Sequence, residues 1–131
     1  MDYKPLFDRF DAGGRLFCAG TVREFAALSW ADHPSFPGVA LKHIVTAAQT
    51  GGGFSYHLVR VAPGKTIGLH THDPQLETHE VIAGAGVCVC GGQRLAYTPG
   101  VIAVLPAGVA HEVTAGPEGL YLFAKFLPAL A

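Results

Sequence analysis

The feature that most restricts the fold of this chain is its regular interruption by glycine and proline. The 131 residues include 17 Gly and 9 Pro, which separate short runs rich in Val, Ile, Leu, Phe and Tyr. Gly and Pro favour turns, and many short β-prone runs between turns are typical of a sandwich or barrel. The sequence therefore predicts an all-β protein. The runs that indicate strands are 54–61, 65–72, 77–83, 86–90, 101–106, 110–115 and 120–127.

The length of the chain indicates a single domain over residues 1–131. Residues 20–31 are the only helix-like stretch, although their pattern fits a strand followed by a turn equally well. Residues 1–20 are expected to form an N-terminal arm, with the first ten or so residues loosely held.

The composition excludes several classes of partner. Half of the residues are hydrophobic, 15% are charged, and the net charge is −1. No basic patch is available for nucleic acid or anionic lipid. Residues 1–14 begin with an acidic residue and lack the apolar core of a signal peptide, and no run approaches the ~18 apolar residues of a membrane span. We therefore expect a cytoplasmic protein that contacts neither nucleic acid nor membrane.

Residues 64–84 concentrate polar side chains that metal sites and acid–base sites use. On a strand, residues two apart share a face, so His70 and His72 point the same way. After the turn at 73–75, Glu77 and His79 share one face and Glu80 lies on the other. A histidine pair alone is often only a polar strand face. A carboxylate on the returning strand makes a metal site more plausible, and a ligand from a distant strand would complete it.

His111 is the candidate for that distant ligand, and the sequence around it resembles the cupin superfamily. The first cupin motif, G-x5-H-x-H-x3,4-E-x6-G, is matched by Gly64, His70, His72, Glu77 and Gly84. The second motif, G-x5-P-x-G-x2-H-x3-N, is matched by Gly100, Pro106, Gly108 and His111. The motif core covers residues 64–115, and the fifteen residues between Gly84 and Gly100 suit the short hairpin of a compact cupin.

The resemblance implies a jelly-roll β-sandwich or barrel with a divalent ion at its mouth. Its ligands would be His70, His72, Glu77 and His111. Three neutral imidazoles and one carboxylate suit Mn, Fe, Co, Ni, Cu or Zn, and they suit Mg and Ca poorly.

Two positions depart from the cupin pattern. Ala115 replaces the closing Asn of the second motif, which is not a ligand in the family. His79 stands where cupins usually carry an aromatic or aliphatic residue. It is expected in the cavity beside Glu77, as an additional ligand, as an acid–base group, or as the residue that displaces Glu77 from the ion.

Two functions remain open on these grounds. One is a metalloenzyme of dioxygenase, isomerase or lyase type acting on a small oxygen-bearing molecule, with Glu77 or His79 moving a proton. The other is a binding or sensing module without turnover. Residues 29–45 faintly resemble the segment before the zinc-binding cupins of anti-sigma regulators. No basic cluster is evident near the motifs, so a neutral or singly charged, partly apolar ligand is expected.

The remaining histidines and the last strand allow three further expectations. His57 is in phase with inward residues of its strand and is interpreted as a buried core histidine, while His33 and His43 are expected to be structural or exposed. Tyr121 and Phe123 alternate with the inward residues of 120–127 and share a face with Lys125. Apolar residues on a partly exposed face predict a homodimer.

Overall fold

The computed structural model describes residues 2–131 and consists mainly of antiparallel strands, which confirms the all-β prediction. Within these residues no helix is long and apolar enough to cross a membrane. The elements in chain order are α1 (Lys4–Gly13), β1 (Arg15–Cys18), β2 (Thr21–Glu24), the 3-10 helix η1 (Phe25–Ala27), β3 (Ala31–Asp32), β4 (Val39–Val45), α2 (Ala47–Thr50), β5 (Ser55–Val61), β6 (Thr66–His70), β7 (Leu76–Cys90), β8 (Gln93–Tyr97), β9 (Ile102–Leu105) and β10 (His111–Leu127).

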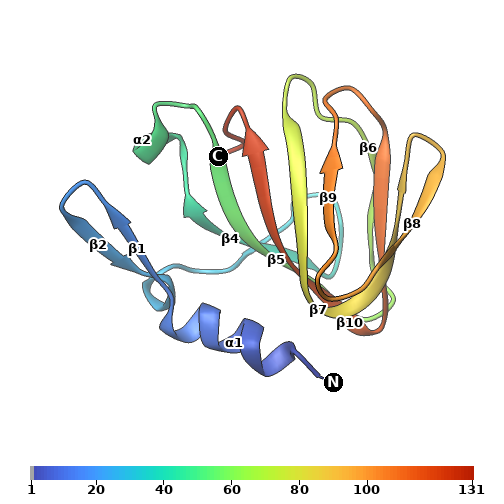
Figure 1. Cartoon of the computed structure of the whole chain (residues 1–131), viewed down its shortest axis with the longest axis horizontal. Coiled ribbons are helices and arrows are strands. Elements are labelled where there is room, and N and C mark those ends of the chain that lie inside the picture. Colours follow the sequence, from blue (N-terminus) through green and yellow to red (C-terminus); the bar gives the residue numbers. More distant parts are fainter. Residues whose placement is uncertain (1) are drawn as a thin grey trace.

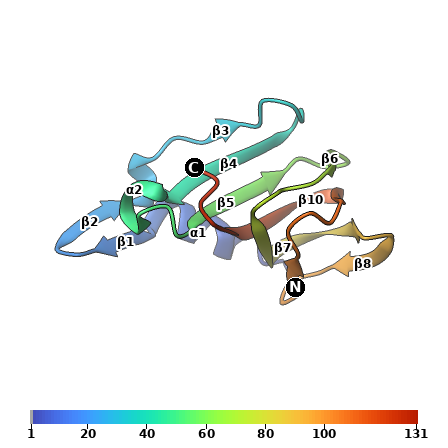
Figure 2. The same cartoon turned by 90° about the horizontal axis from the view of Figure 1, so that it is seen from above.

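Two long strands, β7 and β10, organise the sandwich (Figure 1). Residues 76–84 of β7 pair with residues 120–127 of β10. On the β7 side this pair is extended by β9, and on the β10 side by β5, β4 and β3 in that order. Residues 86–90 of β7 pair with residues 111–115 of β10. This second pair is extended by β8 on the β7 side and by β6 on the β10 side. The same two strands thus contribute to both layers of the jelly roll, and Figure 2 shows the layers from above.

From the sequence, each of these long strands was predicted as two shorter strands, because the glycines between them were interpreted as turns. The structure instead continues β7 through Gly84 and Gly86, and β10 through Gly116 and Gly119, with a register shift between Ala115 and Leu120. A Cβ added to Gly84, whose φ is +74°, would lie 2.1 Å from the carbonyl oxygen of Gly119. Glycine is therefore needed here for close approach of two backbones rather than for a turn.

Gly84→Ala is expected to lower the free energy of unfolding by about 2 kcal/mol or more, because it adds a steric clash to the cost of a positive φ. Gly92→Ala is a matched control, since Gly92 has a φ of +80° and nothing within 4 Å of an added Cβ. It should lose only the backbone component, about 1 kcal/mol. Urea unfolding of both variants measures the difference. Equal losses would show that the contact with Gly119 is not limiting.

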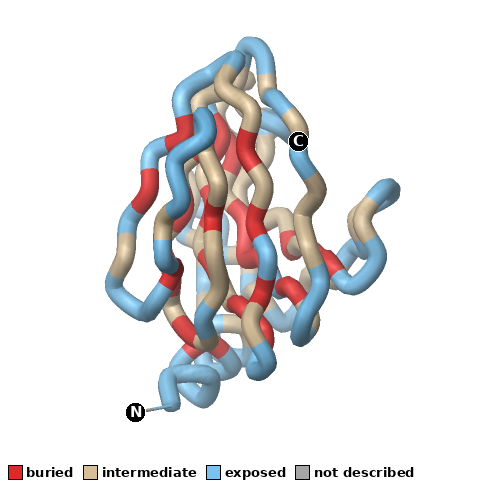
Figure 3. The backbone as a smooth tube through the Cα atoms, turned by 90° about the vertical axis from the view of Figure 1, so that its right-hand side faces the viewer, coloured by how far each residue is buried: buried red, intermediate tan, exposed pale blue. Residues whose placement is uncertain are grey.

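Figure 3 shows that the buried positions are spread along the strands. Most of the buried apolar residues form one main core, with members on β4, β5, β7, β8, β9 and β10. From Leu76 to Val81 the inward positions of β7 alternate strictly with partly exposed ones, which confirms the strand phase expected from the sequence. Leu58 and Ala83 belong instead to a second apolar cluster outside the sandwich. This second cluster is where the N-terminal segment packs.

The expectation of a loose N-terminal arm is wrong. Residues 4–13 form α1, which begins with Pro5 in its first turn and buries Phe7 to 2% exposure. The Phe7 ring lies 5.1 Å from the ring of Tyr121, and the Phe10 ring lies 5.2 Å from that of Phe123. Most of the stability of a helix this short comes from tertiary contacts, which explains why its local sequence signal is weak.

This helix also covers the strand face on which the homodimer prediction was based. Tyr121 and Phe123 pack against α1 of the same chain, so their apolar surfaces do not require a partner subunit. The homodimer remains a prediction.

Three other segments differ from the sequence-based expectations. Residues 20–31 contain β2 and η1 and no α-helix, so the strand-and-turn alternative is the correct one. β4 and β8 were not predicted. β4 contains the polar residues Lys42 and His43, which weaken its strand pattern. β8 is short and lies between residues that favour turns.

Candidate metal centre

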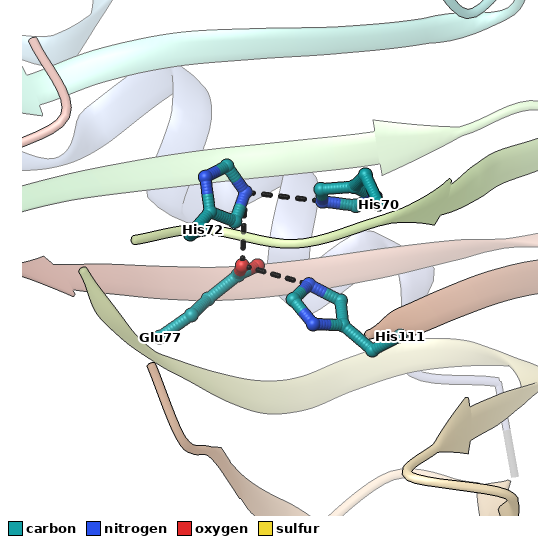
Figure 4. A group of neighbouring side chains, drawn as sticks. All are labelled: His70, His72, Glu77 and His111. Atoms are coloured by element: carbon teal, nitrogen blue, oxygen red, sulfur yellow. Dashed lines mark hydrogen bonds and ion pairs between the residues drawn. The ribbon is translucent and has the colours of Figure 1, made fainter. Parts of the chain in front are cut away.

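Three strands of the sandwich, and the segment that follows one of them, bring the motif residues together beside the cavity. His70 is the last residue of β6 and pairs with His111, the first residue of β10. His72 follows β6, and Glu77 lies near the start of β7. Figure 4 shows the three imidazoles and the carboxylate pointing toward one another. The ligand atoms of these four residues all lie within 4.8 Å of one another.

The distances in this cluster fit a single transition-metal ion. Nε2 of His70 lies 3.0 Å from Nε2 of His72. Oε1 of Glu77 lies 3.1 Å from Nε2 of His111 and 3.4 Å from Nε2 of His72. Donors about 2.1 Å from one ion, at tetrahedral or octahedral angles, stand about 3.0–3.4 Å apart. The donor set therefore fits such an ion in both geometry and chemistry.

The other ring nitrogens orient two of the imidazoles. Nδ1 of His70 lies 2.6 Å from the carbonyl oxygen of Gly68, and Nδ1 of His111 lies 3.2 Å from that of Val109. A carbonyl only accepts hydrogen bonds, so each Nδ1 carries a proton and donates it. In the neutral rings Nε2 then presents its lone pair to the cluster, as metal-ligating histidines commonly do.

The electrostatics of the cluster favour a cation beside Glu77. This side chain is 5% exposed. Burial raises the pKa of Glu77, but hydrogen bonds from the charged form of His111 and from His79 outweigh burial and hold it below its ordinary value. Burial lowers the pKa of His111, but its hydrogen bond to Glu77 and the charge of that carboxylate raise it overall. A buried carboxylate kept ionised in this way requires a positive partner.

His79 lies behind Glu77 and not among the four clustered groups. Its Nε2 makes a short hydrogen bond to Oε2 of Glu77, and its Nδ1 lies 2.8 Å from the phenol oxygen of Tyr97. A carboxylate only accepts hydrogen bonds, so Nε2 of His79 carries a proton and donates it to Glu77. In the neutral ring Nδ1 then accepts from the phenol of Tyr97, which is fully buried and keeps its proton because burial raises its pKa. Both ring nitrogens of His79 are therefore engaged.

A cavity of about 60 Å³ adjoins the cluster. Its polar wall contains His70, His72, Glu77 and His79, whereas Glu80 points away and lies 3.3 Å from Nζ of Lys125. The placement of Glu77 and His79 inside and Glu80 outside confirms the expected strand phase. His33 also lines the cavity, which differs from the structural or exposed role expected for it. Tyr97 was not anticipated, because β8 itself was not predicted.

The remaining histidines form a separate pair, in which His57 is buried and His43 is partly buried. Nδ1 of His57 lies 2.8 Å from Nδ1 of His43, and Nε2 of His57 lies 2.8 Å from Oγ of Ser55. His57 is fully buried and does not line the cavity, which confirms its interpretation as a core histidine. Burial, with a smaller contribution from His43, lowers the pKa of His57 to about 4.

This shift predicts acid sensitivity of the fold. Between pH 6.5 and 4 the unfolded chain binds a proton at His57 that the folded chain does not, so acid favours unfolding. The free energy of unfolding should fall as the pH drops through this window, by about 2 kcal/mol at pH 5 from His57 alone. Urea unfolding at pH 7 and pH 5, with a chelator present throughout, measures the loss. His57→Gln should lose about 2 kcal/mol less than the natural chain, and an equal loss would contradict the assignment.

The fold and the site together place the chain in one class of protein. It is a small jelly-roll protein in which three histidines and one glutamate converge beside an internal cavity, in an arrangement that fits a metal ion. The family model for the cupin domain matches residues 57–123, more than half of the chain. The chain belongs to the cupin family.

Solved structures agree with this fold. An RmlC-like cupin from Shewanella frigidimarina is 18% identical, with a TM-score of 0.70 and coverage of 88% of this chain and 95% of the other. A predicted oxalate decarboxylase from Thermotoga maritima is 20% identical, with a TM-score of 0.68 and coverage of 77% and 91%. Ectoine synthase from P. lautus is 23% identical, with a TM-score of 0.64 and coverage of 72% and 67%. No curated protein sequence matches the chain.

Proposed function

We propose that His70, His72, Glu77 and His111 hold a divalent transition-metal ion, and that the chain is a metal-dependent enzyme acting on a small oxygen-bearing molecule. The observation that supports this most strongly is the convergence of four ligand atoms within 4.8 Å beside an internal cavity. Two of the similar structures bear the names of small-molecule enzymes, a predicted oxalate decarboxylase and ectoine synthase, which is compatible with this proposal.

In this proposal the clustered residues hold the ion, and Glu77 and His79 transfer a proton. A bound ion would supply Lewis acidity for an oxygen of the substrate. Glu77 directs Oε1 toward the three clustered histidines and Oε2 toward His79. A proton taken up by this carboxylate can therefore pass between a ligand at the cluster and His79. We assign Glu77 and His79 together as the proton-transfer pair, with Tyr97 holding the ring of His79 in place. The apolar wall of the cavity limits access of water to the reacting end.

A second function, binding or sensing without turnover, is favoured by one observation. Both ring nitrogens of His79 are hydrogen-bonded within the protein, so His79 offers no free group directly to a ligand. His79 would then take no part in proton transfer, and a ligand would be held at the cluster without turnover.

Metal analysis of the purified protein tests the shared part of both functions. We expect about one ion per chain in the natural protein and a large loss in His111→Ala. To separate the two functions, the metal-loaded protein is incubated with a small-molecule extract, and the extract is followed by mass spectrometry. Consumption of one compound with appearance of another supports the enzyme. Retention of a compound without conversion supports the binding module, and absence of metal contradicts both.

A further inference from the structure

The loop between β3 and β4 forms part of the cavity wall through His33. Nδ1 of His33 accepts hydrogen bonds from the backbone N–H groups of Ser35 at 3.0 Å and Phe36 at 3.2 Å. A nitrogen that accepts two N–H groups carries a lone pair and no proton, so the neutral ring must carry its proton on Nε2. The backbone of the loop thereby fixes the tautomer of His33.

The position of this ring is fixed as well. The His33 ring stacks on that of Phe36 at 4.6 Å, and the Phe36 ring lies 5.8 Å from that of His70. A Cβ added to Gly68 would lie 2.8 Å from the Phe36 ring, so this glycine lets the loop pack closely on β6. Among residues 2–131, Nε2 of His33 has no hydrogen-bond acceptor within the protein. Because His33 lines the cavity, this N–H is the group that its ring can offer to a ligand there.

The rest of the lining restricts what that donor can meet. About 60 Å³ holds roughly four water-sized spheres, so only a small molecule or the end of one can enter. No Lys or Arg lines the cavity, and a second negative charge on a ligand would be buried without a partner. The rest of the lining is apolar and consists of Val39, Leu41, Val59, Ile67, Ala124, Phe126 and Leu130.

We propose that His33 is a ligand-binding residue whose Nε2–H holds an oxygen of a small, singly charged or neutral molecule. Another oxygen of that molecule faces His70, His72, Glu77 and His111, and its apolar part lies on the wall that includes Val39 and Ile67. A short monocarboxylate is the simplest chemistry that meets all three requirements. This inference rests on the proposed metal site and names the class of ligand for it.

Butyrate is a suitable probe because its carboxylate has two oxygens and its chain is short and apolar. The protein is loaded with Co²⁺, whose visible absorption reports ligand binding at the ion, and Kd is measured by titration. His33→Asn keeps a side-chain oxygen that can accept the backbone N–H groups of the loop, but its shorter side chain withdraws the donor from the cavity. We expect this variant to keep its cobalt and to bind butyrate at least about tenfold more weakly, as for loss of a hydrogen bond to a charged group.

Ser35→Ala is the control in the same loop, because it alters an exposed side chain and leaves the backbone N–H in place. It should bind butyrate like the natural chain. Succinate has the same four-carbon chain with a second carboxylate in place of the methyl group, and benzoate has a larger apolar part. Both should bind at least about tenfold more weakly than butyrate, succinate because of its buried charge and benzoate because of its size.

The outcomes separate this inference from the proposed function. If the natural chain does not bind Co²⁺, the metal site is wrong and the inference fails with it. If Co²⁺ binds but butyrate does not, or if His33→Asn binds butyrate as tightly as the natural chain does, the inference alone is overturned. Equal affinity for succinate or benzoate would overturn the ligand class. Selective weakening in His33→Asn, with cobalt retained, supports it.

Discussion

Replacing His111 with alanine is expected to lower metal affinity more than about 100-fold. His111 is one of three imidazoles whose Nε2 atoms face the cluster, and its ring is buried and held in place by the carbonyl oxygen of Val109. Losing a ligand costs more than the 10- to 100-fold that loss of a supporting hydrogen bond costs. The measurement is the metal content of each variant after equilibration with a competing chelator. His70→Ala and His72→Ala should behave in the same way.

Two neighbouring variants test which groups are ligands. Glu77→Ala should weaken binding less than loss of a histidine, because three imidazoles remain and Nε2 of His79 already points to the place of the missing carboxylate. His79→Ala should keep the metal, with at most about tenfold lower affinity. His79 is not one of the four clustered residues and acts on the site only through its hydrogen bond to Glu77.

Two results would contradict this assignment of the site. If His79→Ala loses as much metal as His70→Ala, the site has four histidine ligands and Glu77 is not among them. If none of the five variants changes the metal content, no metal site exists here. The protein would then bind only organic ligands or have a structural role.

The four clustered residues were predicted from strand alternation together with the resemblance to the cupin motifs. Strand alternation placed Glu77 and His79 on the inward face and Glu80 on the outward face, and the structure has the same phase. The place of His111 beside the histidines of the first motif was implied by the resemblance to the cupin motifs, and the structure pairs His111 directly with His70. Periodicity alone is sufficient for Glu77 and His79 because the alternation of a strand depends on local backbone geometry.

The residues around the cluster could not be predicted in that way. His33 reaches the cavity from a loop far from the motifs, and its orientation depends on the backbone of that loop. Tyr97 reaches His79 from the hairpin after the first motif. Neither position has a periodic signal, since each depends on how distant segments pack. Gly84 was misread as a strand end for a related reason, because close approach to Gly119 is a tertiary contact.

The second large effect concerns the attachment of α1 to the sandwich. Lys42 on β4 is 3% exposed, donates to the carbonyl oxygen of Phe25 at 2.8 Å, and forms an ion pair with Asp11 at the end of α1. Asp11 in turn accepts a hydrogen bond from Nε1 of Trp30 at 3.1 Å. Asp11→Ala leaves a buried ammonium group without its carboxylate, and we expect the free energy of unfolding to fall by about 3 kcal/mol. Urea unfolding followed by the fluorescence of Trp30 measures this loss at the site itself.

The size of this effect depends on burial of the charge and not on the number of ion pairs, and α1 contains the comparison. Asp8 pairs with Lys4 at 2.8 Å, with both side chains about half exposed. Asp8→Ala should therefore cost no more than about 0.5 kcal/mol. The double variant Asp11→Leu with Lys42→Met removes both buried charges and should recover much of the loss from Asp11→Ala, because neither partner is left unpaired. If the two single aspartate variants lose the same amount, the buried pair does not hold the helix. Its attachment would then rest on Phe7 and its apolar neighbours alone.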